Sequence, residues 1–98
     1  NIIHFDLSKL ENIGHEAFYW CLANHFCSYP NLTSIAQHAM CGNVNLTVVV
    51  LNNLKIISSY SFSYCWGIRY VEMSQLQVIE ASCFDQCSSL QVARFKSV

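Results

Sequence analysis

The residues in this chain that could do chemistry are six cysteines and four histidines among 98 residues. Cys83 and Cys87 stand four positions apart, a spacing that brings two thiolates to one face of a helix, where they could join a metal ion. No second pair stands at the spacing of a zinc site, and the four histidines occupy unrelated positions. We therefore expect no metal, no cofactor and no catalytic residue in this chain.

Composition narrows the class of partner. A formal net charge of −1 offers no basic surface for nucleic acid, and no apolar stretch approaches the ~18 residues of a membrane span. No Ser-His-Asp order or glycine-rich phosphate loop stands out, so we expect no enzymatic activity and no small-molecule substrate. Only 11% of the residues are charged, about half the usual share, which indicates that something covers part of the apolar surface.

The sequence repeats every 22 residues without insertion or deletion. Leucine and isoleucine recur at this spacing as Leu10, Leu32, Leu54, Leu76 and as Ile13, Ile35, Ile57, Ile79. Fixed columns of one residue type are typical of a solenoid, whose repeats bury their apolar faces by stacking on one another. We expect one array spanning 1–98, with repeats at about 2–23, 24–45, 46–67 and 68–89 and a partial repeat at 90–98.

The ends of the array carry no polar capping repeat, which a solenoid needs for solubility. The first strand pattern already contains apolar residues in phase with the repeat, and Val98 stands in phase at the other end. We therefore expect either a segment of a longer solenoid or a protein whose ends are covered by partners, for example by end-to-end self-association through the uncapped ends. The alternative is a complete domain with atypical ends.

The third repeat shows two different periods. Val48 to Leu51 is a β-branched run with period-2 alternation, which predicts a short strand. Asn52 and Asn53 then favour a turn. Further on, Ile57, Phe62 and Cys65 share a spacing that predicts one face of a short helix. The repeat is therefore expected to be strand, turn and helix.

Strand and helix together predict an α/β leucine-rich-repeat solenoid. Parallel strands stack at ~4.8 Å, whereas helices need roughly 10 Å of width, so such a stack bends with its strands inside the curve. We expect a curved horseshoe segment of about four 22-residue repeats, with parallel strands on the concave face and short helices on the convex face.

The cysteines fit this repeat as small apolar residues. Cys21, Cys65 and Cys87 share one column that points into the stack, and Cys27 falls in an inward strand column. A disulfide between neighbouring members of the column would need closer Cα atoms than stacked helices allow. Cys41 lies after the inward helical position, so we expect it near the surface as the candidate reactive thiol.

A family resemblance is visible in the first repeat. Its Leu10-x-x-Ile13-x-x-x-Ala17-Phe18-x-x-Cys21 pattern resembles the LxxIxxxAFxxCxxL signature of BspA-like leucine-rich repeats. The pattern recurs over the whole chain, with Met40 and Asn43 replacing Phe and Cys in the second repeat. This resemblance implies a surface or secreted protein that adheres to host, matrix or partner proteins, or alternatively an intracellular scaffold.

Outward strand positions form two columns on the expected concave face. The first column is His4, Phe26, Val48, Tyr70 and Val92, and the second is Asp6, Ser28, Val50, Glu72 and Arg94. Apolar and aromatic side chains on consecutive exposed strands commonly mark a protein-binding surface. The candidate partner-binding residues are Phe26, Val48, Val50, Tyr70, Glu72, Val92 and Arg94, although the same residues are also good strand formers.

Two further surface features remain open. Asn31-Leu32-Thr33 and Asn45-Leu46-Thr47 satisfy the N-glycosylation sequon, so Asn31 and Asn45 are candidate glycan sites if the chain is secreted. Four aromatic residues at the ends of the expected helices form a rival convex surface, which could bind a partner or pack between adjacent helices, and we favour packing: Tyr19, Trp20, Tyr64 and Trp66.

The leading functional hypothesis is a non-enzymatic protein-binding array at the cell surface, in adhesion or receptor-like recognition. The alternative is a cytoplasmic leucine-rich-repeat scaffold segment of a signalling protein. The identity of the partner does not follow from the residues, because a fold of this kind hosts many functions.

Overall fold

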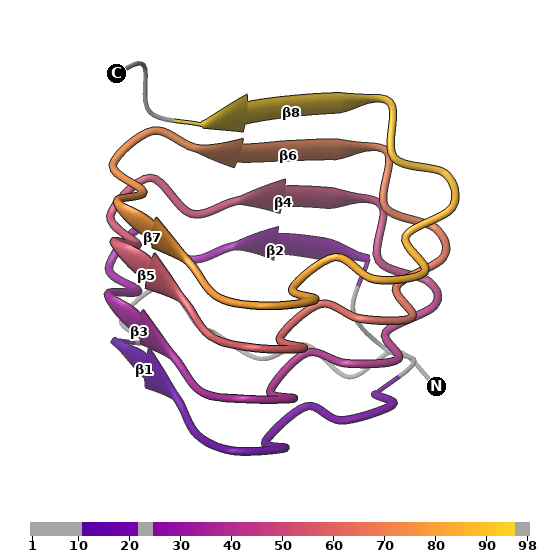
Figure 1. Ribbon diagram of the computed structural model, residues 1–98, viewed down its shortest axis with the longest axis horizontal. Helices are drawn as coiled ribbons and strands as arrows, with labels where there is room; N and C mark the ends of the chain where they lie inside the picture. Colours follow the sequence, from indigo (N-terminus) through magenta and orange to yellow (C-terminus); the bar gives the residue numbers. More distant parts are fainter. Residues whose placement is uncertain (1–10, 22–24, 96–98) are drawn as a thin grey trace.

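A computed structural model describes residues 11–21 and 25–95, which form a parallel β-solenoid of about four turns (Figure 1). Each turn contributes one strand to each of two parallel four-stranded sheets. The sheet of longer strands comprises β2 (Phe26–Ser28), β4 (Val48–Val50), β6 (Tyr70–Met73) and β8 (Val92–Phe95). The sheet of two-residue strands comprises β1 (Asn12–Ile13), β3 (Ser34–Ile35), β5 (Ile56–Ile57) and β7 (Val78–Ile79).

The sheet of longer strands confirms the predicted strands and their register. Val48 pairs with Tyr70, and Val49 pairs with Val71, so each residue lies beside its counterpart 22 positions later. Along β4 and β6 the side chains alternate between partly exposed and buried, as a sheet with one covered face requires. The repeat length therefore sets the pairing directly.

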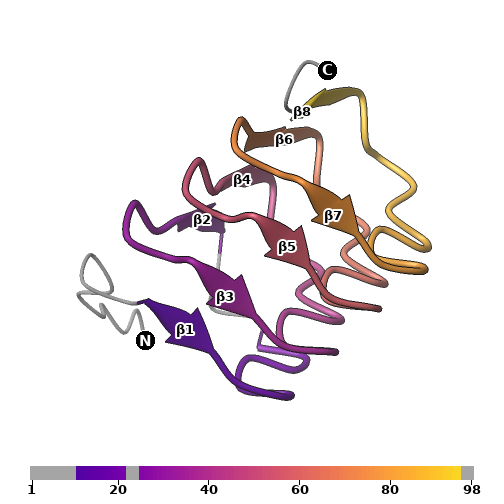
Figure 2. The same ribbon diagram turned by 60° about the vertical axis from the view of Figure 1, so that its left-hand side comes forward.

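The helices predicted for the convex side are wrong: residues 11–21 and 25–95 contain no helix. Ile57, expected to begin a helix, is the inward residue of the short strand β5. The residues after it form consecutive turns, and the equivalent turn segments stack along one side of the solenoid (Figure 2). The sequence predicted correctly that these residues point inward, but it predicted a helical backbone where the structure has turns.

Hydrogen bonding in the turn segments explains the absence of a helix. The Phe18 N–H donates to the carbonyl of Ala39 in the next turn at 2.9 Å, whereas the Ala17 N–H donates to Gly14 within its own turn at 3.1 Å. Donation alternates in this way along the segment and recurs in the following repeats. Because every second N–H is bound to a neighbouring turn, the i to i−4 ladder of a helix cannot form.

Each turn segment also contains two residues with a left-handed backbone, and the equivalent residues of successive segments are 22 positions apart. The non-glycine residues with φ between 53° and 63° are Glu16, Trp20, His38, Tyr60, Tyr64, Ser82 and Gln86, and Gly42 has φ 77°. A left-handed conformation costs a non-glycine residue about 1–2 kcal/mol and cannot occur inside a right-handed helix. Stacking of the turns must offset this cost.

The second sheet also removes the expected cause of bending. The horseshoe prediction rested on helices being wider than the ~4.8 Å spacing of strands. In the described turns, parallel strands occupy both sides, as Figure 2 shows for the β1-β3-β5-β7 and β2-β4-β6-β8 ladders. Successive turns are therefore separated by the same strand spacing on both sides, and the described turns contain no wider helical layer that would bend the stack.

The core lies between the two sheets and contains the repeated columns. Leucine at 32 and 54 and isoleucine at 35 and 57 are almost completely buried. The last turn is less covered, because Ile79 is 51% exposed and Phe95 is 37% exposed although both stand in inward columns. Burial therefore comes from the neighbouring turn, as expected of a solenoid.

Two further points concern the limits of the described chain. Residues 11–21 and 25–95 contain no helix, and therefore no helix there is long and apolar enough to cross a bilayer. His4 and Asp6, the first members of the two outward columns, lie outside the described residues.

Candidate functional site

The outward side chains of the longer-stranded sheet form a surface that we call the display face. Its first row pairs across the strands as Phe26, Val48, Tyr70 and Val92, and its second row as Ser28, Val50, Glu72 and Arg94. The structure thus brings together all seven residues singled out from the sequence. They lie on consecutive strands, so one partner could contact several of them at once.

The two ends of the display face differ in chemistry. Phe26 on β2 is 66% exposed, the highest value among the large apolar residues that the structure describes. Beside it, Val48 and Val50 on β4 are only partly covered. This end is therefore an apolar surface with one aromatic ring available as an anchor.

The other end of the display face, on β6 and β8, carries hydrogen-bonded polar side chains. The Tyr70 hydroxyl donates to Glu72 Oε1 at 2.5 Å, and Asn52 Nδ2 donates to Glu72 Oε2 at 2.8 Å. The bond from Tyr70, then that from Asn52, and then the nearby charge of Arg94 hold the pKa of Glu72 below its usual value. The same bond raises the pKa of Tyr70. Glu72 is thus held ionised and oriented on this face.

Asn52 is the member of this group that sequence reasoning missed. It was assigned only to a turn, but its Oδ1 also accepts the Ser74 N–H at 3.0 Å. One amide therefore connects two successive turns and orients the Glu72 carboxylate. Its column in the repeat carried no signal of this role, because the partner lies 20 residues away.

The cysteines are structural in the described chain. All six are free thiols, and burial raises the pKa of Cys65 to about 12 and that of Cys87 to about 11. Cys65 Sγ donates to the Met40 carbonyl at 3.1 Å, and Cys87 Sγ donates to Phe62 at the same distance. Each thiol therefore bonds a carbonyl 25 residues earlier, in the preceding turn.

Asn43 performs the same task in the one repeat that lacks this cysteine. Its Nδ2 donates at 2.8 Å both to the Phe18 carbonyl, 25 residues earlier, and to Met40. The prediction that Cys41 is a surface thiol is wrong, because it is only 4% exposed and burial raises its pKa. A buried thiol with a raised pKa carries little of the nucleophilic thiolate.

Both sequon asparagines, Asn31 and Asn45, are exposed, as a glycan would require. The sequon threonines have a second role, however. Thr33 Oγ1 donates to the Glu11 carbonyl and Thr47 Oγ1 to the His25 carbonyl, each at 3.2 Å and each 22 residues earlier. These hydroxyls would be selected for stacking even in a chain that is never glycosylated.

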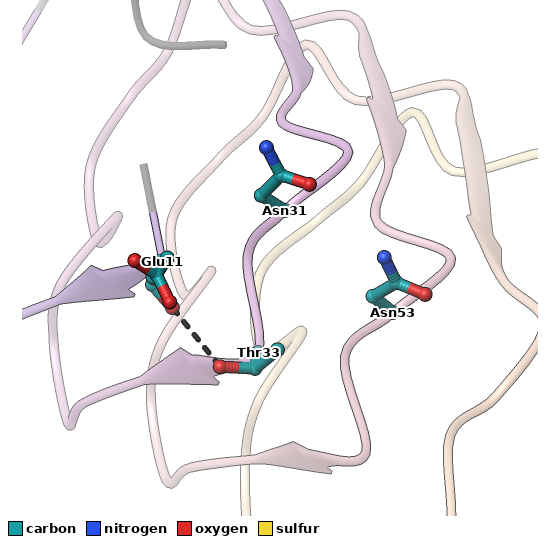
Figure 3. A pocket seen from close by; sticks show the side chains of 4 residues that line it. All are labelled: Glu11, Asn31, Thr33 and Asn53. Atoms are coloured by element: carbon teal, nitrogen blue, oxygen red, sulfur yellow. Dashed lines mark hydrogen bonds between the residues drawn. The ribbon is translucent and has the colours of Figure 1, made fainter. Parts of the chain in front are cut away.

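A polar hollow of about 450 Å³ lies beside the first sequon, and Figure 3 shows its four lining side chains, Glu11, Asn31, Thr33 and Asn53. The dashed line in Figure 3 is the bond from Thr33 to Glu11, and Asn53 Nδ2 bonds the Pro30 carbonyl. These bonds tie one turn to the next. No group of three metal-ligating side chains occurs there or elsewhere in the described residues.

The turn segments present a second exposed surface. Five aromatic side chains are 40–46% exposed there, and we call them the aromatic edge: Tyr19, Trp20, Tyr60, Tyr64 and Trp66. Trp20 stacks on Tyr64 with ring centroids 6.4 Å apart, and its contact with Trp66 at 6.2 Å is edge-to-face. These rings pack on one another, as interpreted from the sequence, but they pack between turns and remain substantially open to solvent.

The architecture and its repeated columns can be compared with known proteins. A family model described as the BspA type leucine-rich repeat region matches residues 1–98 with six copies. The chain belongs to the BspA-type leucine-rich repeat family. No curated protein and no solved structure matches it. Membership of this family indicates a protein-binding repeat role and is generally associated with non-enzymatic proteins.

Proposed function

We propose that this BspA-type array is a non-enzymatic module that binds a partner protein through its display face, in adhesion or receptor-like recognition at a cell surface. The carrying observation is Phe26, a large exposed ring in register with Val48 and Tyr70 on the next two strands. The polar group around Glu72 lies beside this apolar surface. An aromatic anchor beside a polar rim is the usual composition of a protein interface.

The cell-surface assignment is supported by the family, whose members are often surface-associated in bacteria. Glycans at Asn31 or Asn45 would support secretion in a cell that glycosylates such sites. Mass spectrometry of the natively expressed protein tests this directly, and unmodified asparagines would favour the intracellular alternative.

Capture of the partner tests the display face. Cells expressing wild-type protein or the double variant Phe26→Ser/Tyr70→Ser are cross-linked, and the captured proteins are compared by mass spectrometry. We expect the double variant to lose its specific partner at least tenfold while retaining its circular dichroism spectrum. Ile56→Ser is the matched control, because Ile56 is a 49% exposed aliphatic residue on the outward side of the other sheet. Equal capture by the double variant and wild type would show that the display face is not the binding surface.

One observation favours the alternative function, an intracellular scaffold segment of a signalling protein. All six cysteines are free thiols. Disulfides form and persist in oxidising compartments, so a chain with six unpaired cysteines suits a reducing one. The full-length gene discriminates between the two functions: a signal peptide and anchor support the surface role, and a fused signalling enzyme supports the scaffold.

The exposed inward residues of the last described turn support a further part of the proposal, end-to-end association of copies of this segment. β7 and β8 are edge strands, and the inward residues Ile79 and Phe95 are exposed there. A second copy could add a parallel turn and cover both residues. Sedimentation should show a concentration-dependent dimer that Ile79→Lys/Phe95→Lys abolishes and Phe26→Ser preserves. A monomer at every concentration would contradict this association.

A further inference from the structure

The aromatic edge does not continue into the fourth repeat. In the fourth repeat the positions equivalent to the five aromatic residues are polar, namely Ser82, Asp85, Gln86 and Ser88. The rings of the aromatic edge therefore come from the first and third repeats, the second repeat contributes only the imidazole of His38 at these positions, and the fourth contributes no ring. Turn stacking alone does not require rings at these positions, because the fourth turn makes the same backbone bonds, for example from the Tyr64 N–H to the Asp85 carbonyl.

Three of these rings also stand at backbone positions that favour glycine. Trp20, Tyr60 and Tyr64 have φ of 53°, 59° and 60°. Gly42 occupies the same column as Trp20 and Tyr64 and has φ 77°. Large side chains at left-handed positions are uncommon and are retained where the surroundings or a function favour them.

Trp20 is held in place before any ligand arrives. A Cβ added to Gly42 would come within 2.2–2.7 Å of three atoms of the Trp20 ring, so the indole occupies the space of a missing side chain. Tyr19 at 6.2 Å, Tyr64 and Trp66 surround the ring. The ring is nevertheless 42% exposed. It is a preordered aromatic platform, and binding to it would order little that is not already ordered.

The fixed charges on the turn segments are all negative, and His15, in contact with Glu16, is neutral at pH 7 in the formal charge count. The turn segments 14–21, 36–44, 58–66 and 80–88 contain Glu16, Glu80 and Asp85 but neither lysine nor arginine. The described cationic side chains, Lys55, Arg69 and Arg94, lie outside these segments. Aromatic faces attract cations through the ring quadrupole, and carboxylates nearby add a favourable field. A neutral sugar could stack on the rings but would gain nothing from this net charge.

We propose that the aromatic edge is a second binding surface, separate from the display face, and that it takes a basic peptide segment with an arginine side chain stacked on Trp20. The guanidinium group is planar and stacks on aromatic rings more readily than an ammonium group does. Asp85 lies on the fourth turn, three strand spacings or about 14 Å from the turn of Trp20, which matches about four residues of an extended peptide. Arginine on Trp20 and a second cation near Glu16 or Asp85 are compatible with this length.

Intrinsic fluorescence reports on this surface without a label, because the only two tryptophans of the chain, Trp20 and Trp66, both belong to it. The probe is a nine-residue Gly-Ser peptide carrying three arginines. The matched probe carries three citrullines, which keep the shape and lose the charge. We expect saturable quenching by the arginine peptide, at least tenfold weaker binding of the citrulline peptide, and weakening of the arginine peptide by salt.

Two variants locate the effect. Trp20→Gly places glycine at a left-handed position and removes the platform, so binding followed through Trp66 should weaken at least tenfold without loss of the fold. Asp85→Asn should weaken binding severalfold and reduce the salt dependence. Phe26→Ser on the display face is the control and should leave the quenching unchanged.

The remaining outcomes each overturn the proposal. Equal affinity for the arginine and citrulline peptides would show that charge is not recognised. Quenching by maltohexaose but not by the arginine peptide would make the occupant a sugar. A concentration-dependent shift of tryptophan emission without any peptide would make it a second copy of the chain.

Discussion

The display face and the aromatic edge are built from the same repeat, but their backbones impose different demands. On the display face, strand geometry accepts any residue that suits a sheet, and the three different residues Phe26, Val48 and Tyr70 stand in one row. On the aromatic edge, the left-handed positions favour glycine, and only one of eight is glycine. Both surfaces are hydrogen-bonded between turns, but only the edge also holds non-glycine residues in left-handed conformations, whose cost the stacking must offset.

Among the substitutions that test this comparison, removing the side-chain amide of Asn43 should lower the free energy of unfolding the most. Asn43→Ala removes two hydrogen bonds, one to the carbonyl of Phe18 and one to that of Met40, and empties part of a buried site, so we expect the free energy of unfolding to fall by about 2–3 kcal/mol. Urea denaturation measures the loss. Asn43→Cys restores the thiol found elsewhere in this column and should cost about 1 kcal/mol or less. An equal loss in both variants would show that the donor is unimportant.

The next effect concerns the space that Trp20 occupies. Gly42→Ala forces an alanine into a left-handed conformation and against the indole, which should cost about 1–3 kcal/mol. We also expect the tryptophan emission to shift to longer wavelength as the ring is displaced. Gly14→Ala is the control, since a Cβ there meets nothing within 4 Å. Unchanged emission in Gly42→Ala would mean that Trp20 is not held by this contact.

A smaller effect, of opposite sign, is expected at His38. Its ring stacks on Tyr60 at 5.1 Å, but its buried Nδ1 has no hydrogen-bond partner. His38→Phe keeps the stack and removes the unpaired nitrogen, so the free energy of unfolding should rise by about 1 kcal/mol. Thermal unfolding checks this, with the exposed His25→Phe expected to change stability by less than about 0.5 kcal/mol. A clear destabilisation would mean that Nδ1 is satisfied by ordered water.

The smallest effect belongs to the display face and depends on pH. The folded pKa of Glu72 lies below its usual value, so the unfolded chain takes up the proton first as pH falls. Its contribution to stability is therefore complete above the usual glutamate pKa of about 4.3 and is lost as pH falls through the folded pKa. Glu72→Gln should show a shallower loss of stability than wild type between about pH 6 and pH 3 in urea titrations. Parallel profiles would exclude an oriented, ionised Glu72.

Much of the display face could be predicted because it depends on two regular spacings. Alternation along a strand decides which side chains point outward, and the 22-residue repeat decides which of them are neighbours. Asn52 escaped prediction because its link to Glu72 joins two turns through side chains alone. Such a bond leaves no periodic trace in the sequence.

The aromatic edge was predicted less well because its backbone was misassigned. The spacing of Ile57, Phe62 and Cys65 suits the inward face of a helix, and it equally suits alternating turns that bury the same residues. A glycine in the left-handed column would have indicated turns, but only Gly42 stands there. With Trp20 and Tyr64 in its place elsewhere, the signal was lost.

The amino-acid sequence by itself determined the repeat, the parallel stacking of turns and the division of side chains into inward and outward columns, because burial by an identical neighbour repeats at the same interval. Only the tertiary structure decided between helices and turns, because the choice depends on where each second N–H finds its acceptor. In the segment after β1, Phe18 donates to Ala39 of the next turn. That acceptor exists only once the turns are stacked, and with it the second sheet and the exposed aromatic edge are formed.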